Sequence, residues 1–553
     1  MTIKGYDAFL ECLSSEGVDY LFGNPGTTEL AIMEAVGKQS DIEYILGLQE
    51  NIVVAMADGY ARASGSLAVA NVHVAPGLGN AMGSIYNAKF FGSPVLITAG
   101  QQEQGHGLTE PMLYDPLVPI AQPLVKWAIE CTRIQDLPLI IHRAAKIALT
   151  PPMGPVFLSL PGDVLDASAD IAIGRPTRIN TQVLPNQETL NTLALAILKA
   201  KNPAIVAGHE VASRDALEEA GELALTMGAP VFQQTIPYSA QFKSEHPTFL
   251  GALSRNQKVC REQLETHDLV VFLGSDVLRM SVFSEIDPLP SHIKIVQIGE
   301  RDWELGKNYP AEFAIRANVK ETTSALIKLL RNMMSDGNKS AAAKRLADVK
   351  RRNWSSKKIE RIAQAQSFDN TKPINTLKLM MELARSIPND CVVIEEALSS
   401  SVNLLNYLPL KDHQGYFGLA SGGIGFAMGG AIGVSLALPD RPIVALVGDG
   451  SSMYSIQALW TAAHLKRPIT YVISNNQGYK ILKQRLMSFR GTDRYIGMNI
   501  TDPAIDYVKL SESMGVPAIR IEDPGDLNDA LTHATRSNKT NLIEVMVSTD
   551  INT

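Results

Sequence analysis

Two short polar clusters in the C-terminal third of the chain have the residue types of a site for a metal and a diphosphate. The first, Gly448 to Ser452, follows the apolar run 443–447, and the second, Asn475-Asn476, follows the apolar run 469–473. Asp449 offers an anionic oxygen and Asn476 an amide oxygen. Both suit Mg²⁺, which binds a few protein oxygens together with substrate phosphates. The small residues of the first cluster let backbone N–H groups approach a phosphate.

The segments around these clusters predict one βαβ unit that positions them. Both apolar runs have strand length and β-branched character, and residues 456–463 between them carry apolar side chains at helical spacing. The carboxyl ends of neighbouring parallel strands meet at one edge of an open sheet, where such sheets bind ligands. The helix after Asp449 would present its positive N-terminus to the phosphates. Taken singly, each cluster is better explained as a tight turn.

The spacing of the two clusters is more specific than either cluster alone. Asp449 and Asn476 are 27 positions apart (476 − 449), and this GDG…NN pattern closely resembles the signature of thiamine diphosphate (ThDP) enzymes. The resemblance implies that Asp449, the side chain of Asn476 and the backbone carbonyl of Gly478 bind Mg²⁺.

The likeness spans essentially the whole chain and is weakest in its middle part. It points to the decarboxylase and acetolactate synthase group, and within that group to the benzoylformate decarboxylase type. The similar stretches are 22–26 (FGNPG), 48–50 (LQE), 57–61 (ADGYA), 79–83 (GNAMG), 98–102 (TAGQQ), 123–127 (PLVKW) and 458–463 (ALWTAA). The resemblance implies ThDP bound between two subunits of a homodimer or homotetramer.

The chain of 553 residues is too long for one hydrophobic core. Its alternating strand-like and helical segments predict an α/β protein of three doubly wound domains. The resemblance assigns 1–175 to a pyrimidine-binding domain, 190–335 to a central domain and 360–553 to the domain that binds diphosphate and Mg²⁺. The motif G-x-G-x-A-M-G occurs at 77–83 and again at 423–429, as expected of two related domains.

Composition excludes several classes of function. An apolar content of 45% and a charged content of 19% are typical of a soluble enzyme, and a net charge of −7 argues against nucleic-acid or membrane partners. The four cysteines are scattered singly, as in reduced cytosolic proteins, and no secretory signal is visible, so we expect a cytoplasmic location. The uncharged stretch 414–439 is the one alternative membrane span, but its eight glycines make it a poor one.

ThDP chemistry needs a carboxylate beside the aminopyrimidine ring, and Glu50 is the candidate. It follows the apolar run 44–46 and begins an apolar helix. By the resemblance, Glu50 shares a proton with ring nitrogen N1′, so that the imino nitrogen takes the proton from C2. General base catalysis of this kind is worth about 10² to 10⁴ in rate. The alternative is a glutamate that only stabilises a helix N-terminus.

The resemblance also assigns residues to the cofactor and the substrate. Ile424 would lie beneath the cofactor and force its bent conformation, and His73 would handle protons on the intermediates. For His73 the alternative is a turn histidine without a catalytic role. The other cofactor-binding residues would be Ser399, Ser400, Gly423, Gly448, Gly450, Ser451 and Tyr479. The substrate pocket would be lined by Thr27, His73, Ser281 and Leu482, although Leu482 is equally explained as core.

Two positions depart from the benzoylformate decarboxylase pattern. Thr27, expected to be catalytic, stands where that type has serine, so a hydroxyl remains. Ser281 stands where that type has a second catalytic histidine, and a serine cannot relay protons near neutral pH. Either another group, for which His106 is a candidate, protonates the enamine intermediate, or the enamine attacks an acceptor carbonyl.

The sequence therefore predicts a ThDP- and Mg²⁺-dependent 2-oxo acid decarboxylase, a carbon–carbon lyase that releases an aldehyde from an enamine. One alternative is an acetolactate synthase-like carboligase that makes 2-hydroxy ketones. FAD is possible there but not favoured, because the central region has no clean G-x-G-x-x-G. The other alternative is a non-catalytic protein with this fold. The missing histidine supports it, while the intact Glu50, Asp449 and Asn476 oppose it.

Overall fold

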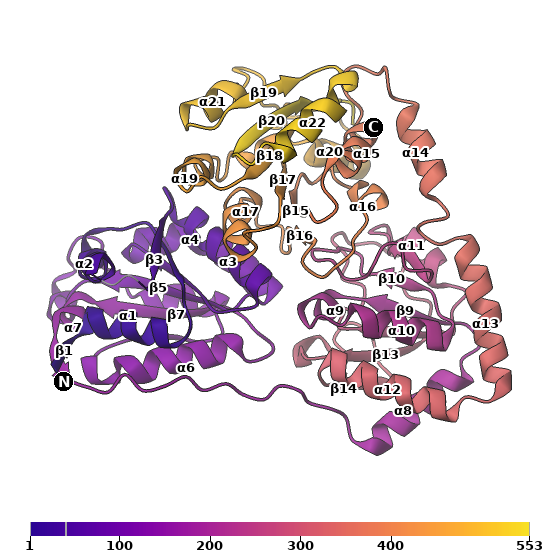
Figure 1. Ribbon diagram of the computed structural model, residues 1–553, viewed down its shortest axis with the longest axis horizontal. Coiled ribbons are helices and arrows are strands. Elements are labelled where there is room, and N and C mark those ends of the chain that lie inside the picture. The colour runs from indigo at the N-terminus through magenta and orange to yellow at the C-terminus, as the bar shows by residue number, and fades with distance from the viewer. Residues whose placement is uncertain (1, 39–40, 552–553) are drawn as a thin grey trace.

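The computed structural model describes residues 2–38 and 41–551 of the chain, which form three α/β bodies (Figure 1). Each body is built on one six-stranded sheet in which all neighbouring strands are parallel. Parallel strands need crossover helices, which cover both faces of such a sheet. The three doubly wound α/β domains predicted from the sequence are therefore confirmed.

The N-terminal sheet has the order β3-β2-β4-β5-β7-β6. Its strands are β2 (Tyr20–Gly23), β3 (Glu43–Leu46), β4 (Ala68–Val72), β5 (Val95–Gln101), β6 (Ala128–Glu130) and β7 (Val156–Pro161). Its main helices are α1 (Gly5–Ser15), α2 (Leu30–Lys38), α3 (Glu50–Ser64), α4 (Val74–Phe91) and α6 (Leu137–Leu149). A short antiparallel pair, β1 (Thr2–Lys4) with β8 (Ser168–Asp170), closes this body.

The central sheet has the order β11-β10-β9-β12-β13-β14, so the chain reverses direction across the sheet between β9 and β12. Its strands are β9 (Pro203–Ala207), β10 (Val231–Gln233), β11 (Phe249–Ala252), β12 (Leu269–Leu273), β13 (Lys294–Gly299) and β14 (Phe313–Arg316). Its helices include α8 (Gln187–Lys199), α10 (Leu217–Met227), α11 (Gln257–Leu264) and α12 (Val319–Met333). The chain then runs through α13 (Asp336–Arg351) and α14 (Lys358–Gln366) towards the C-terminal body (Figure 1).

The C-terminal sheet has the order β16-β15-β17-β18-β20-β19. Its strands are β15 (Val392–Glu396), β16 (Tyr416–Gly418), β17 (Ile443–Gly448), β18 (Ile469–Asn475), β19 (Ala518–Ile521) and β20 (Asn541–Met546). Its helices include α15 (Thr376–Ser386), α17 (Phe426–Ala437), α18 (Asp449–Ser452), α19 (Ala458–His464), α20 (Lys480–Arg490), α21 (Tyr507–Ser513) and α22 (Leu527–Arg536). The two apolar runs of the predicted βαβ unit are β17 and β18, which are buried along nearly their whole length.

The N- and C-terminal sheets share one topology, with corresponding strands in the same order. In this correspondence α3 matches α17, because each follows the second strand of its sheet. The repeated G-x-G-x-A-M-G motif does not follow it: residues 77–83 lie inside α4, after the third strand, whereas 423–429 lie at the start of α17. The motif is therefore no record of the relation between the two domains.

Helices α3 and α17 pack directly against each other and join the two bodies in one hydrophobic core. A Cβ atom added at Gly433 would lie 1.9 Å from the carbonyl oxygen of Met56, and one at Gly59 would lie 2.2 Å from that of Gly430. Only glycine permits this approach of two backbones. The stretch 414–439 thus forms β16, a loop and α17, and within residues 2–38 and 41–551 no helix is long and apolar enough to cross a membrane.

Candidate functional site

The carboxyl ends of β17 and β18 bring Asp449 and Asn476 to one edge of the C-terminal sheet, as the sequence predicted for a βαβ unit. Asp449 is buried, and its Oδ2 accepts a hydrogen bond from the Gly478 N–H at 2.9 Å. Burial raises the pKa of Asp449 to about 6, although the N–H groups of Gly450 and Gly478 act in the opposite direction. The Oδ1 atom of Asn476 is buried and has no hydrogen-bond partner within the described chain.

A second orphaned oxygen follows a neighbouring strand of the same sheet. Ser400 follows β15, the neighbour of β17, and its Oγ is buried without a hydrogen-bond partner among the residues described. Ser399 beside it is half-buried and Ser451 is buried at the start of α18. Buried polar groups are normally satisfied, so orphaned oxygens at one sheet edge indicate that a ligand completes them. Together with the N–H groups of a helix start they fit a phosphate-bearing ligand.

The donor set also fits the hard cation predicted from the sequence. Over residues 2–38 and 41–551 there is no group of three or more His, Cys, Asp or Glu side chains that could hold a metal. A metal at this edge would therefore be held by the single carboxylate of Asp449 with neutral oxygens such as that of Asn476. Mg²⁺ accepts such a set because phosphate oxygens and water complete its shell.

The loop 477–479 is shaped by close packing. Gln477 has a φ of 57°, in the left-handed region. A Cβ added at Gly478 would lie 2.3 Å from the carbonyl oxygen of Met498, so no side chain fits there. The ring of Tyr479 lies against Gly450, with 2.6 Å between its Cε1 and the position of an added Cβ. This packing ties the loop after β18 to the loop after β17.

The segment Gly423 to Gly425 is held by a carboxylate that sequence reasoning missed. Glu396, the last residue of β15, accepts hydrogen bonds from the N–H groups of Gly425 (2.5 Å) and Ala427 (2.6 Å) at the start of α17. Burial raises the pKa of Glu396 to about 7, although these N–H groups lower it. The one sequence signal was an acidic residue at the end of an apolar run. Ile424, between the two glycines, is half-buried.

Glu50 is the first residue of α3 and is 7% exposed. Its Oε2 accepts a hydrogen bond from Asn80 Nδ2 at 3.1 Å, and a Cβ added at Gly77 would lie 2.9 Å from its Oε1. The neighbouring Asn51 places its Nδ2 2.7 Å from an added Cβ at Gly425. The helix starts that carry Glu50 and Ile424 therefore adjoin each other within one chain.

His73 is held by a buried glutamate that the sequence analysis also missed. The His73 Nδ1 atom lies 2.7 Å from Glu29 Oε2 and 3.3 Å from Thr28 Oγ1. Glu29 is fully buried, whereas the His73 side chain is 21% exposed, so the ring is anchored on one side and open on the other. The hydroxyl that contacts His73 belongs to Thr28, while the predicted Thr27 is exposed. The acid in the first turn after Thr27-Thr28 was the only sequence signal for Glu29.

The backbone around His73 is strained. Val74 has a φ of 38°, a region that a β-branched residue rarely adopts. A Cβ at Gly26 would lie 1.9 Å from the His73 Nδ1 atom, so the loop 24–26 packs directly under the ring. Strain of this kind persists where the surroundings impose it, and functional sites are common among such places.

A cavity of about 750 Å³ lies between the central and C-terminal bodies. Ser281 lines it, together with Leu398, which precedes Ser399, and Gly422, which precedes Gly423. Leu482 is 46% exposed on α20, and this helix reaches the cavity through Arg485 instead. His106 is exposed in the short helix Gln104–Thr109.

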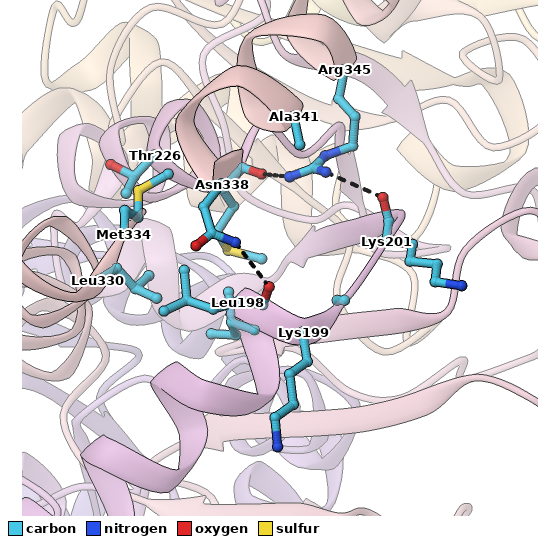
Figure 2. A pocket seen from close by; sticks show the side chains of 12 residues that line it. Leu198, Lys199, Lys201, Thr226, Leu330, Met334, Asn338, Ala341 and Arg345 are labelled. Carbon is cyan, nitrogen blue, oxygen red and sulfur yellow. Dashed lines mark hydrogen bonds between the residues drawn. The ribbon is translucent and has the colours of Figure 1, made fainter. Parts of the chain in front are cut away.

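Two other hollows are less suited to catalysis. The crevice where the central sheet reverses direction is filled by a buried cluster that includes Glu210, Asp276 and Arg301, and about 10 Å³ is left open. A cavity of about 330 Å³ on the outer side of the central body is lined by α8, α12 and α13 residues (Figure 2). Two of its polar side chains donate to backbone carbonyls: Asn338 to that of Leu198, and Arg345 to those of Met227 and Lys201.

Comparison with known proteins covers all three bodies. The chain matches family models described as the N-terminal TPP binding domain (residues 3–113), central domain (190–326) and C-terminal TPP binding domain (399–545) of thiamine pyrophosphate enzymes. It is 31% identical to benzoylformate decarboxylase of Pseudomonas aeruginosa over 547 residues, 98% of this chain and 99% of the relative. It is 26% identical to the acetolactate synthase large subunit of Haemophilus influenzae over 557 residues, 99% and 95% of the two chains.

Solved structures give the same picture. A thiamine diphosphate-dependent 4-hydroxybenzoylformate decarboxylase of Rhodococcus jostii RHA1 superposes with a TM-score of 0.86 at 29% identity, covering 99% of this chain and 100% of that one. Benzoylformate decarboxylase from Polynucleobacter necessarius superposes with a TM-score of 0.86 at 27% identity, covering 99% of each chain.

Proposed function

The chain belongs to the thiamine pyrophosphate enzyme family, and we propose that it is a ThDP- and Mg²⁺-dependent 2-oxo acid decarboxylase of the benzoylformate decarboxylase type. The family resemblance of the sequence is thereby confirmed, and the chain is an enzyme, so the non-catalytic alternative is set aside. The observation that carries the proposal is the set of unsatisfied oxygens, Asn476 Oδ1 and Ser400 Oγ, which follow strands next to the one that ends at the buried Asp449.

Each part of the site has a defined task in this proposal. Asp449, Asn476 and the Gly478 carbonyl would hold Mg²⁺, and the N–H groups at the start of α18 with the serines 399, 400 and 451 would hold the diphosphate. Glu50 would hold a proton at N1′ of the aminopyrimidine, and Ile424 would pack against the coenzyme. When bound, ThDP supplies the electron sink that lets the carboxylate of a 2-oxo acid leave as CO₂.

Proton transfer to the substrate falls to His73. Glu29 accepts from Gly26 N–H (2.9 Å) and Gly100 N–H (2.8 Å), so both of its oxygens act as acceptors. The His73 Nδ1 facing it must then carry the proton, which leaves Nε2 as the free base. Glu29 thus selects the tautomer of His73 and orients its ring.

One observation favours the carboligase as the second candidate. The cavity at Ser281 measures about 750 Å³, within the range of sites for much larger ligands than a small 2-oxo acid, about 300 to 1,000 Å³. A second carbonyl compound would fit beside the first. The filled crevice of the central body, in contrast, speaks against a flavin nucleotide there.

A direct test measures CO₂ release from a panel of 2-oxo acids by the protein loaded with ThDP and Mg²⁺. Glu50→Gln should lower turnover at least about 100-fold while calorimetry still detects coenzyme binding. Glu43→Gln, at an exposed position on β3, is the matched control and should behave as wild type. Near-normal turnover by Glu50→Gln would remove Glu50 from the mechanism, and no coenzyme binding by wild type would refute the proposal.

We further propose that the active unit is a homodimer or homotetramer with the coenzyme at a subunit interface. Large apolar side chains stay exposed around the site, among them Val402 (69%), Tyr454 (53%) and Leu48 (44%), and a second copy would cover them.

Mixing two inactive variants tests the shared site. If Glu50 and Asp449 act from different chains, refolding Glu50→Gln with Asp449→Ala restores about a quarter of wild-type activity, because half of the random dimers contain one intact site of two. If both residues act from the same chain, the mixture stays inactive.

A further inference from the structure

The cavity between the central and C-terminal bodies carries unpaired positive charge. Arg255, after β11, and Arg485, on α20, both line it, and neither forms an ion pair with any described residue. A third arginine is different: Arg279 Nη2 lies 2.9 Å from Asp276 and 3.0 Å from Glu304. Its charge is therefore balanced within the protein, while those of Arg255 and Arg485 are not.

The acidic residue Glu395 also lines the cavity, but it forms no ion pair with either arginine among the described residues. Glu395 Oε1 accepts from the Ala397 N–H (2.8 Å) and from the Ser401 hydroxyl, and its Oε2 accepts from the Tyr416 hydroxyl (3.2 Å). These donors face both oxygens of Glu395 and hold it against its own domain. The two guanidinium groups thus remain available to a ligand.

The same cavity reaches the segments proposed to hold the coenzyme. Gly422 and Leu398 directly precede the coenzyme-binding residues Gly423 and Ser399, and Ser281 lines the cavity from the central body. Arg485 lies three residues after Leu482, on the same side of α20. A substrate whose reacting end lies at the coenzyme would therefore extend its other end into the space lined by the arginines.

We propose that Arg255 and Arg485 bind a second anionic group at the far end of the substrate, so that the preferred 2-oxo acids carry a distal carboxylate or similar anion. Guanidinium groups pair with planar carboxylates through two parallel hydrogen bonds. A monoanionic substrate of the same length would leave both charges without a partner. This inference rests on the proposed decarboxylase function and specifies its substrate class.

Matched substrate pairs test the inference on the coenzyme-loaded enzyme. One pair is 2-oxoglutarate with 2-oxovalerate, and the other is 4-carboxybenzoylformate with benzoylformate; each pair differs only in the distal carboxylate. Wild type should show at least about tenfold higher kcat/KM for the dianionic member of the pair it uses. Arg485→Met and Arg255→Met should each lower that selectivity ratio about tenfold through KM. Arg490→Met, exposed in the last turn of the same helix, should leave it unchanged.

The outcomes separate this inference from the proposed function. The inference is overturned if the enzyme prefers the monoanionic member of a pair, or if neither arginine variant changes the selectivity ratio. Either result leaves the proposed decarboxylase function standing. Failure of every 2-oxo acid refutes the proposed function. Calorimetry with glutarate as the probe then tests whether the two arginines bind an anion. Binding that both variants weaken supports this anion site, and no binding to wild type overturns it.

Discussion

Replacing Glu29 by glutamine tests the proposed role of His73 in proton transfer and of Glu29 in orienting it. In the wild type four donors converge on the buried carboxylate: the Gly26 and Gly100 N–H groups, the Thr28 hydroxyl (2.8 Å) and His73 Nδ1 (2.7 Å). Glutamine keeps the size of the side chain but has only one oxygen. If the glutamine amide nitrogen takes the place of Oε2, this nitrogen faces the Gly26 N–H and His73 Nδ1, which both donated to Oε2 in the wild type.

The two groups respond differently. The Gly26 N–H is fixed and loses its acceptor, which costs about 1–3 kcal/mol of unfolding free energy. His73 adapts by moving its proton from Nδ1 to Nε2, so that Nδ1 accepts from the amide. The atom that faces the open side of the ring then no longer accepts a proton. Because general acid–base catalysis is worth about 10² to 10⁴, we expect kcat to fall by about that factor, with KM little changed.

Three measurements check this account. Steady-state kinetics give kcat and KM, chemical denaturation gives the loss of stability, and nitrogen NMR shifts of His73 report which ring nitrogen carries the proton. Glu34→Gln, at an exposed residue of α2, makes the same chemical change without a catalytic role. If Glu29→Gln retains kcat within about threefold of wild type, or if the His73 tautomer does not change, then Glu29 does not orient His73.

Three further predictions concern other parts of the molecule. Asn476→Ala should weaken Mg²⁺-dependent coenzyme binding about 10- to 100-fold by calorimetry, yet the coenzyme-free protein should lose little stability, because Asn476 Oδ1 has no protein partner among the described residues. Arg62→Met should lower the unfolding free energy by about 3–5 kcal/mol in denaturant titrations, because Arg62 pairs with the buried Asp58 at 2.5 Å and a buried carboxylate without a counter-charge remains, bonded only to the neutral Asn87 and Ser93; a loss below about 1 kcal/mol would contradict this. For Glu210, burial raises the pKa to about 7 from 4.5. Because the folded protein binds this proton more tightly than the unfolded chain, protonated Glu210 adds to the unfolding free energy at low pH, and that addition is lost as pH rises from about 4.5 to 7. Glu210→Gln removes this titration, so the unfolding free energy of the variant relative to wild type should increase over that pH range by up to about 3 kcal/mol. Parallel pH profiles of melting temperature for the two proteins would refute the raised pKa of Glu210.

The placement of Asp449 and Asn476 at one edge of the C-terminal sheet could be predicted from the sequence, because it depends only on residues that are close together in the chain. The strands β17 and β18 are short apolar runs, and the sheet edge is implied once two such runs are parallel neighbours. Asp449 and Asn476 then follow from their positions directly after those strands. The same reasoning identified three α/β domains, since alternation of strands and helices is a property of chain order.

The contacts that orient the site were not predictable in this way. Glu29 reaches His73 across 44 residues, and Glu396 reaches Gly425 across 29, so neither contact leaves a periodic signal in the chain. The cavity-lining arginine of α20 is a similar case. Arg485 lines the cavity three residues after the predicted Leu482, and which side chains of a helix reach such a space depends on what the helix packs against.

Local strain marks the same residues independently of any family likeness. Non-glycine residues with positive φ include Val74, Leu398 and Gln477, and each is next to a residue proposed to function: His73, Ser399 and Asn476. Each such conformation costs about 1–3 kcal/mol and persists only where the surrounding structure imposes it. These costs coincide with the orphaned oxygens of Ser400 and Asn476. Leu398 and Gln477 lie at the same edge of the C-terminal sheet as these oxygens, where a bound ligand would offset both kinds of cost.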